Sequence, residues 1–333
     1  MEPSAYDVLA IGNAIVDVLS HCDDELVARH GLEKGTMTLV DGERAAAVYE
    51  TMGPGVEVSG GSAANTAAGI ASLGGAAAFV GKVADDELGR IFTHDLRATG
   101  VDFSTKPAVS EVGTARCLIL VTPEGERTMN TFLGVAADLD SGDVDEGLMT
   151  SARMVYLEGY LVGVPSAEGA VARTISLARS TGTTLALTLS DPLWAGLHRE
   201  AFAALLPSVD VLLANEDEAL TLSGEGDLEA AISELAVTCS VVAVTRGARG
   251  AMATDGKDTV AVGAEPVDQV VDTTGAGDLF AAGFLFGLSL GLPLETCARL
   301  GTMAAAEIIS HIGARPQTSL RELATGAGLA PPM

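Results

Sequence analysis

The stretch Val270-Val271-Asp272-Thr273-Thr274-Gly275-Ala276-Gly277-Asp278-Leu279-Phe280-Ala281-Ala282-Gly283-Phe284 joins a tight Gly-Ala-Gly turn to an apolar helix. The N–H groups of a first helical turn have no partner within the helix, and the helix dipole makes that end positive. Small residues let an anion approach these groups, so the turn predicts a phosphate site. Asp278 lies beside this site, either as an N-cap or as the base that takes a proton from an attacking hydroxyl.

On both sides of this stretch, short apolar runs alternate with helical patterns, which indicates βαβ units, a largely parallel sheet and an α/β fold. The evenly apolar runs predict strands buried on both faces. We expect strands at residues 8–11, 77–80, 154–157, 184–189, 209–213 and 241–245. We expect helices at residues 62–73, 87–99, 166–180 and 228–235, and a buried helix at 279–292.

Two segments, about residues 14–41 and 101–138, interrupt this rhythm. In the second, the apolar residues 114–121 run into Pro123-Glu124-Gly125, which predicts a β-hairpin with a glycine in its turn. We infer a small β-rich lid built from both segments. Residues 1–333 are expected to form a single domain that carries this lid.

Composition limits the class of partner. The chain carries 19 basic and 45 acidic residues, a formal charge of −26, which argues against a nucleic-acid or anionic-membrane surface. No apolar run reaches the roughly 20 residues of a membrane-spanning helix. The four scattered cysteines and the lack of an apolar leader predict a cytoplasmic protein with reduced thiols.

The segment Asp272-Thr273-Thr274-Gly275-Ala276-Gly277-Asp278 resembles the C-terminal signature of the ribokinase-like carbohydrate and nucleoside kinases. Two further segments match that family in order and spacing: Val58-Ser59-Gly60-Gly61-Ser62-Ala63-Ala64-Asn65 and Asn215-Glu216-Asp217-Glu218. The resemblance covers about residues 8–317. It implies a three-layer α/β sandwich with a largely parallel central sheet and a small lid, and it implies an ATP-dependent kinase.

The resemblance also implies catalytic roles. Asp278 would be the catalytic base, and Gly275, Ala276 and Gly277 would form an anion hole for the transferring phosphoryl group. Arg127, in the expected lid, is similar to the arginine that closes over the phosphates. On sequence alone, an exposed hairpin cation is the commoner situation for such an arginine.

For the nucleotide, the resemblance implies that Asn215 and Glu218 hold Mg²⁺ through water, since Mg²⁺ keeps much of its hydration shell. The same residues are also typical of a solvated helix start. Thr245, Gly247 and Gly250 match the family's nucleotide-binding loop, with Asn215 beside it, whereas Arg246 departs from the usual uncharged residue. A monovalent cation such as K⁺ is implied at Asp272, Thr274, Ile308 and Gly313.

For the phosphate acceptor, the positions that match the family's sugar-binding residues are Asn13, Asp17, Gly61, Ser62 and Asn65. Asn13 lies four residues before Asp17, and this pairing is similar to the one in adenosine kinases within the family. Apolar residues of the lid segments, among them Met37, Leu39, Phe132 and Leu133, would cover a purine or else form the core of the lid. The implied reaction is phosphorylation of the adenosine 5′-hydroxyl, with inosine, guanosine, ribose or another furanose as competing acceptors.

Other classes of protein fit less well. The chain has no G-x-G-x-x-G after its first expected strand, no P-loop at Gly81-Lys82, and no metal-ligand spacing among its five histidines. A non-catalytic, nucleoside-binding family member is the remaining rival, although a binding protein has no need of a base at Asp278. The sequence leaves a monomer and a homodimer equally open.

Overall fold

The computed structural model describes residues 4–329. Within them, nine strands form a large sheet in the order β14-β13-β12-β11-β10-β9-β1-β5-β6. Neighbours from β6 to β12 pair in parallel, and β13 alone runs in the opposite direction, pairing antiparallel with β12 and β14. The strands are β1 (Tyr6–Ile11), β5 (Ala77–Val80), β6 (Asp102–Phe103), β9 (Ala152–Leu157), β10 (Thr184–Thr188), β11 (Val211–Asn215), β12 (Val241–Thr245), β13 (Ala251–Thr254) and β14 (Thr259–Val262).

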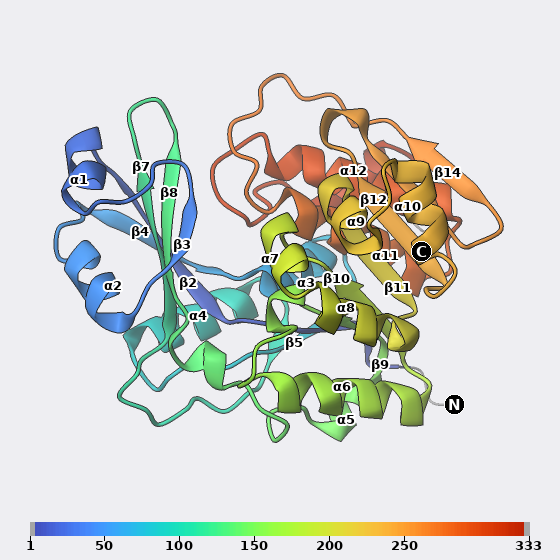
Figure 1. Ribbon diagram of the computed structural model, residues 1–333, viewed down its shortest axis with the longest axis horizontal. Helices are drawn as coiled ribbons and strands as arrows, with labels where there is room; N and C mark the ends of the chain where they lie inside the picture. The colour runs from blue at the N-terminus through green and yellow to red at the C-terminus, as the bar shows by residue number, and fades with distance from the viewer. Residues whose placement is uncertain (1–3, 330–333) are drawn as a thin grey trace.

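Helices cover both faces of this sheet, as the expected three layers require (Figure 1). On β1, Val8 and Ala10 enter one apolar core, whereas Leu9 and Ile11 enter the other. The first core is closed by α3 (Ser62–Ser72), α4 (Glu87–Ala98), α11 (Ala276–Ser289), α12 (Leu294–Ile308) and α13 (Leu320–Gly326). The second is closed by α5 (Glu146–Ser151), α6 (Glu168–Thr181), α7 (Pro192–Leu197), α8 (Arg199–Leu205), α9 (Glu216–Ser223) and α10 (Leu228–Leu235).

A second, five-stranded sheet stands to one side of the large sheet, at the left in Figure 1. Its order is β3-β8-β7-β2-β4, with β2 (Ile15–His21), β3 (Met37–Leu39), β4 (Gly55–Gly60), β7 (Ala115–Val121) and β8 (Arg127–Phe132). The expected hairpin is confirmed, because β7 and β8 pair antiparallel. Helices α1 (Asp24–Arg29) and α2 (Gly42–Tyr49) pack beside this small sheet.

The small sheet differs from the expected lid at two places. Strand β4, at residues 55–60, belongs to it although it lies outside residues 14–41 and 101–138. Strand β6, at residues 102–103, belongs to the large sheet instead. The glycine at each end of β4 hides the strand in the sequence, because glycine is depleted in strands.

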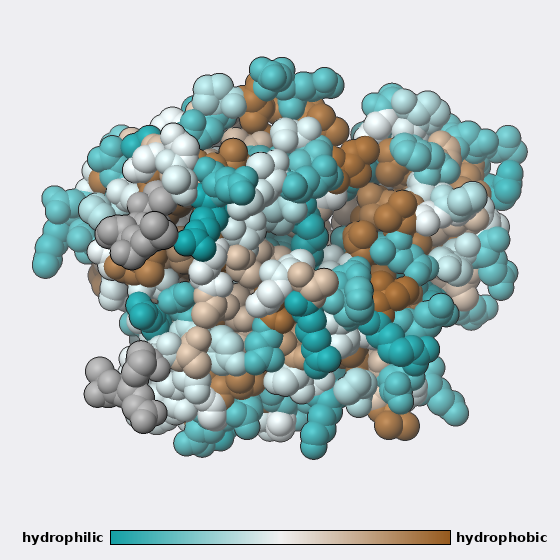
Figure 2. Space-filling model, turned by 180° about the vertical axis from the view of Figure 1, so that it is seen from behind, coloured by the Kyte–Doolittle hydropathy of each residue, from teal (hydrophilic) through white to brown (hydrophobic). Residues whose placement is uncertain are grey.

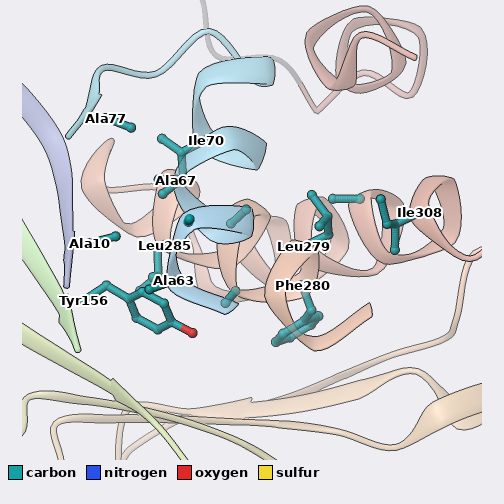
Figure 3. Close-up of a cluster of buried hydrophobic side chains, with 14 of the residues drawn as sticks. Ala10, Ala63, Ala67, Ile70, Ala77, Tyr156, Leu279, Phe280, Leu285 and Ile308 are labelled. Carbon is teal, nitrogen blue, oxygen red and sulfur yellow. The ribbon is translucent and has the colours of Figure 1, made fainter. Parts of the chain in front are cut away.

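Helices α3 and α11 pack closely, and this contact brings their first turns together (Figure 3). A Cβ atom on Gly69 of α3 would lie 2.6 Å from the Cβ of Ala282 and 2.7 Å from Cδ1 of Leu279. The missing side chain at Gly69 therefore allows the close approach of the two helices. As a result, the start of α3 lies against Asp278 at the start of α11.

Figure 2 shows the opposite face, with the small sheet at the right and a hollow between it and the main body. Hydrophobic side chains gather beside this hollow, and most of the remaining face is hydrophilic. Over residues 4–329, no helix combines the length and the apolarity needed to span a membrane. All four cysteines have free thiols.

Candidate active site

The N-terminus of α11 is open. Its N-cap, Gly275, has a φ of 81°, a left-handed conformation that favours glycine, and no side chain caps the helix. The N–H of Ala276 donates to the carbonyl of Thr273 at 3.2 Å. Within residues 4–329 the N–H groups of Gly275, Gly277 and Asp278 have no acceptor. The free donors of this turn are therefore those of residues 275, 277 and 278, whereas Ala276 already has a partner.

Asp278 is held by side chains of α3. Ser62 Oγ donates to Oδ1 at 2.6 Å, and Asn65 Nδ2 donates to Oδ2 at 2.9 Å. Burial raises the pKa of Asp278 above its ordinary value, and these two hydrogen bonds and the charge of Arg315 oppose the shift. Each carboxylate oxygen keeps a free lone pair. Asp278 is thus an oriented carboxylate with a strengthened basicity, as a proton acceptor requires.

Ser62 and Asn65 were expected to bind substrate, and in this structure their donors contact Asp278 instead. Asn65 is 4% exposed, and its Oδ1 has no partner among the described residues. A buried acceptor without a donor is unfavourable, so this oxygen fits a ligand hydroxyl. Asn65 is placed to contact a substrate and the base together.

Asn13, which follows β1, contacts a residue that the sequence analysis missed. Its Nδ2 donates to Oε1 of Glu158 at 2.7 Å, and its backbone N–H donates to Oε2 at 3.3 Å. Glu158 follows β9, the neighbour of β1 in the sheet. Burial raises the pKa of Glu158 to about 7. Ligands bind at the carboxyl ends of such strands, so the position of Glu158 after Leu157 was the available signal.

Asp17 lies on β2 of the small sheet, facing the same site. Burial raises the pKa of Asp17 to about 7, while the charges of Arg315 and Arg127 oppose this rise. A Cβ on Gly60 would lie 2.4 Å from Oδ2 of Asp17, and one on Gly61 would lie 2.2 Å from the carbonyl oxygen of Asn13. The glycine pair therefore lets β4 and the start of α3 pass close to both candidate substrate ligands.

Arg315, after α12, is the second residue that the sequence analysis missed. Its Nε donates to the carbonyl of Ser59 at 3.1 Å, its Nη2 donates to Oγ of Ser59 at 3.1 Å, and its Nη1 donates to the carbonyl of Ala64. Burial lowers its pKa to about 10, while Asp17 and Asp278 oppose the shift. Arg315 thus supplies a fixed positive charge between two carboxylates of the site. A lone arginine outside any recognised segment gives no sequence signal.

Arg127 links the small sheet to the loop that leads into α11. From the start of β8, its Nη1 forms an ion pair with Oδ2 of Asp272 at 2.8 Å and donates to Oγ1 of Thr274 at 3.0 Å. Its Nη2 is buried and has no partner within residues 4–329. A buried guanidinium donor beside the open turn of α11 fits a phosphate oxygen.

The residues expected to hold a monovalent cation are brought together in part. The Asp272 carboxylate accepts the N–H groups of Thr274 at 3.1 Å and Gly313 at 3.0 Å, in addition to Arg127. Ile308 is the last residue of α12, and the carbonyl of the next residue, Ile309, accepts the N–H of Val271. A bound cation needs oxygen atoms with free lone pairs. Three N–H donors already bind the Asp272 carboxylate, so it is less suited to binding K⁺.

Asn215 and Glu218 form a capping box at the start of α9. The Asn215 side chain accepts the Glu218 N–H at 2.8 Å, and Glu218 accepts the Asn215 backbone N–H at 2.8 Å and its Nδ2 at 2.7 Å. Glu218 is 4% exposed, and burial raises its pKa to about 7. The segment is therefore a helix start in which Glu218 is buried while Asp217 is exposed. Since the side chains of Asn215 and Glu218 are both occupied, they fit a metal contact through water better than direct coordination.

The expected nucleotide loop follows β12. Thr245 pairs with Asn215 on the neighbouring strand, which places the loop beside α9. Gly250 has a φ of 83°, and a Cβ there would lie 2.0 Å from the carbonyl oxygen of Val262. Gly247 has a φ of 56° and open space around it. Gly250 lets the loop pass close to Val262, and Gly247 leaves open space on the outside of the loop. Nε of Arg246 is buried without a partner among the described residues.

A cavity of about 170 Å³ lies between the two sheets and ends at Asn13, Ser62 and Glu158. Its remaining walls are mostly apolar and come from both sides: Ile15, Met37, Leu39, Leu133, Tyr160, Leu161, Val164 and Trp194. Trp194 Nε1 donates to the carbonyl of Gly159 at 3.1 Å, which fixes the indole in the wall. Phe132, expected here with Met37 and Leu39, lies under Arg116 instead.

The signature of the pfkB family of carbohydrate kinases matches residues 43–320. This chain belongs to that family. A crystal structure of adenosine kinase from Sinorhizobium meliloti is 48% identical, covers 97% of this chain and 100% of its own, and has a TM-score of 0.91. A probable sugar kinase from Rhizobium etli CFN 42 is 46% identical, covers 98% and 99%, and has a TM-score of 0.91. Adenosine kinase from Saccharomyces cerevisiae is 28% identical over 328 residues, 92% of this chain and 95% of the yeast protein.

These likenesses confirm that this protein is a kinase with a ribokinase-like fold and that it resembles adenosine kinases. The family implies ATP as phosphate donor and a nucleoside or sugar as acceptor. The matched residues include Asp278 and Arg127 but not Asn13 or Asp17. The geometry around those two residues must therefore carry the argument about the acceptor.

Proposed function

We propose that this kinase transfers the γ-phosphoryl group of ATP to the 5′-hydroxyl of adenosine, giving AMP and ADP. The observation that carries this proposal is the cavity, in which apolar walls lead to a polar floor beside Asp278. A purine offers flat apolar faces to such walls, and a ribose offers hydroxyls to Asn13, Asp17 and Asn65. A free sugar has polar groups on every side and would leave Tyr160 and Trp194 without suitable contacts.

In the reaction, Asp278 takes the proton of the 5′-hydroxyl while the new bond to the γ-phosphorus forms and the bond to the β-phosphate oxygen breaks. The free N–H groups of Gly275 and Gly277 and the guanidinium of Arg127 stabilise the charge that develops on the transferring group. The Ala276 N–H would join them only by releasing Thr273. Such positioned proton abstraction contributes about 100- to 10,000-fold in rate.

ATP would lie over the N-terminus of α11 and the loop that contains Thr245, Gly247 and Gly250. Asn215 and Glu218 would hold Mg²⁺ through its water ligands, and the ion would supply positive charge that offsets the charge of the phosphates. Use of K⁺ at Asp272, Thr274, Ile308 and Gly313 stays a prediction. The cytoplasmic location, the single domain and the choice between monomer and homodimer also stay predictions.

The charges around the cavity favour a neutral acceptor. Glu158 lines its polar end, Ser62 there contacts Asp278, and Asp17 lies within electrostatic range of Asp278. The donors of Arg315 are already bound to backbone and side-chain oxygens. An anionic acceptor such as a sugar acid or a sugar phosphate would face three carboxylates at close range. The same repulsion would help a phosphorylated product to leave.

Phosphorylation of a free furanose such as ribose is the second candidate. One observation favours it: a cavity of about 170 Å³ is below the roughly 300–1,000 Å³ of most ligand pockets. A nucleoside would therefore require the small sheet to move away from the large sheet before binding. Motions of such lids are common among kinases.

The test is a coupled ADP-release assay with ATP, Mg²⁺ and one acceptor at a time: adenosine, inosine, guanosine, ribose, fructose or gluconate. We expect adenosine to exceed the other acceptors in kcat/KM by at least tenfold, and gluconate to be inactive. A higher kcat/KM with ribose or fructose than with adenosine would mean that the acceptor is a free sugar. The absence of turnover with every acceptor would favour a non-catalytic binding protein.

A further inference from the structure

Glu158 is a buried carboxylate to which the family signature gave no role. It is 1% exposed, and three N–H donors converge on it. Oε1 accepts from Nδ2 of Asn13 at 2.7 Å, and Oε2 accepts from the backbone N–H of Asn13 at 3.3 Å and of Ala63 at 3.0 Å. An ionised glutamate only accepts hydrogen bonds, so it satisfies all three donors at once.

The contact with Nδ2 decides which way the Asn13 amide faces. An asparagine side chain presents a donor at one end and an acceptor at the other, and its neighbours fix the choice. Here Glu158 takes the donor end, so Oδ1 is the free end of the amide. Oδ1 has no partner within residues 4–329, and both Asn13 and Glu158 line the cavity.

The backbone at Gly12 leaves room for the Glu158 carboxylate. A Cβ on Gly12 would lie 2.2 Å from Oε2 of Glu158, so only glycine leaves room at that position. No basic side chain within residues 4–329 forms an ion pair with Glu158, and burial of an unpaired carboxylate is unfavourable. Asp278, Tyr156 and Tyr160 are the titratable groups nearest to it. The desolvation of Glu158 is therefore offset by its three N–H donors and not by an ion pair, which indicates that the carboxylate serves to hold these donors in place.

We propose that Glu158 is a positioning residue that orients Asn13, so that its carbonyl oxygen accepts a hydrogen bond from a hydroxyl of the substrate. Glu158 acts through Asn13 and does not contact the reacting atoms. The inference rests on the proposed function, since it assigns the acceptor's hydroxyl recognition in that same cavity. It makes Glu158 a determinant of acceptor affinity and leaves the chemical step to Asp278.

The first test is Glu158→Gln, which keeps the shape and replaces one acceptor by an amide donor. The amide can no longer satisfy all three N–H groups, so Asn13 loses its fixed orientation. We expect KM for adenosine to rise at least tenfold while kcat changes less than threefold and KM for ATP is unchanged. The matched control is Glu168→Gln, an exposed glutamate at the start of α6, which should leave all three values unchanged.

A double-mutant cycle with Asn13→Ala tests whether Glu158 acts through Asn13. The combined variant should raise KM no more than the larger single change, because both remove the same hydrogen bond. Among 2′-deoxyadenosine and 3′-deoxyadenosine, the analogue lacking the recognised hydroxyl should show no further loss in Glu158→Gln. Additive effects, or an unchanged KM in Glu158→Gln, would overturn the proposal.

Three provisions keep the test decisive. If Glu158→Gln does not fold, Glu158→Asp keeps the charge but withdraws it from Nδ2, and should raise KM several-fold. If the wild-type protein turns over ribose and not adenosine, the proposed function fails, and the same cycle is run with ribose. If nothing is turned over, the rise in Tm caused by adenosine replaces KM, and Glu158→Gln must lose that rise.

Discussion

Helices α9 and α11 both begin in the candidate active site, but their N-termini differ. Helix α9 is closed by its own capping box, in which Asn215 and Glu218 bind each other's backbone N–H groups. Helix α11 starts at Gly275 with no side-chain cap, and the N–H groups of Gly277 and Asp278 have no acceptor in the described part of the chain. Both sites were recognised in the sequence as short segments of small and polar residues.

The difference separates anion binding from cation binding. The free N–H groups of α11 and the positive end of its dipole attract a phosphoryl group. In the first turn of α9, the N–H groups of Glu216 and Asp217 also have no acceptor among the described residues. Three acidic side chains surround them, so this turn repels an anion and favours a hydrated metal ion. A kinase needs both, and here each is built from a helix start.

Asp278→Asn should have the largest effect, because it removes the only carboxylate in the first turn of the open helix. We expect kcat to fall at least 100-fold with little change in KM, since the side chain keeps its size but accepts no proton. Steady-state kinetics measures this. The control is Glu87→Gln, an exposed acidic residue in the first turn of α4, which should keep kcat within twofold. Near-normal turnover of Asp278→Asn would remove Asp278 from the mechanism.

Gly277→Ala tests whether the space in front of α11 is used. No atom lies within 4 Å of a Cβ at this position, so the protein should fold with an equal or higher Tm, since alanine favours helix. We expect kcat/KM for ATP to fall roughly tenfold because the methyl group crowds the phosphoryl site. Gly326→Ala in α13 also has open space and should leave kcat/KM for ATP unchanged, with an equal or higher Tm. Normal kinetics in Gly277→Ala would show that the phosphoryl group lies elsewhere.

Asn215→Ala would open the closed helix. Loss of an asparagine N-cap costs about 0.5–2 kcal/mol, so the urea midpoint should fall with an unchanged m-value. The Mg²⁺ concentration for half-maximal turnover should rise a few-fold, because Glu218 loses its fixed orientation. Urea unfolding and a Mg²⁺ titration check the two parts, and an unaltered midpoint would mean that the capping box adds nothing to stability.

The smallest effect is the opposite response of stability and turnover to pH. Burial raises the pKa of Glu218, Asp17 and Glu158 to about 7, well above their ordinary values. These groups favour the folded state when protonated, so their contribution is complete below about pH 4 and is lost as pH rises through 7. Tm should therefore be a few degrees higher at pH 6 than at pH 8.

kcat should instead rise between pH 6 and pH 8, because Asp278 must be ionised and burial raises its pKa. The acid limb of the kcat profile should lie at higher pH than for an exposed aspartate. Thermal unfolding and kcat, followed over the same pH series, give both curves. Parallel changes in Tm and kcat would contradict the assigned protonation states.

The sequence predicted the large sheet well, because its strands are apolar on both faces. The ranges 77–80 and 241–245 agree with β5 and β12, and 228–235 agrees with α10. Strand β4 was missed because glycines flank it, and the lid boundaries shifted with it. Local patterning carries the apolar strands, whereas a glycine-rich edge strand depends on its partner β2.

For the site, the sequence predicted which segments meet but not which atoms bind. Ser62 and Asn65 were recognised, yet their contact with Asp278 joins residues more than 200 positions apart. Glu158 and Arg315 were missed because a single charged residue forms no pattern in one sequence. Only the contact of β1 with β9, and of the loop after α12 with α3, brings them to the site.

The most direct test of phosphoryl transfer at the open helix is ³¹P NMR of the reaction with ATP, Mg²⁺ and adenosine. The account predicts that wild-type protein forms ADP and a 5′-monophosphate in equal amounts, and that Asp278→Asn forms neither at a comparable rate. A product phosphorylated at another hydroxyl, or equal product formation by the two proteins, would contradict it.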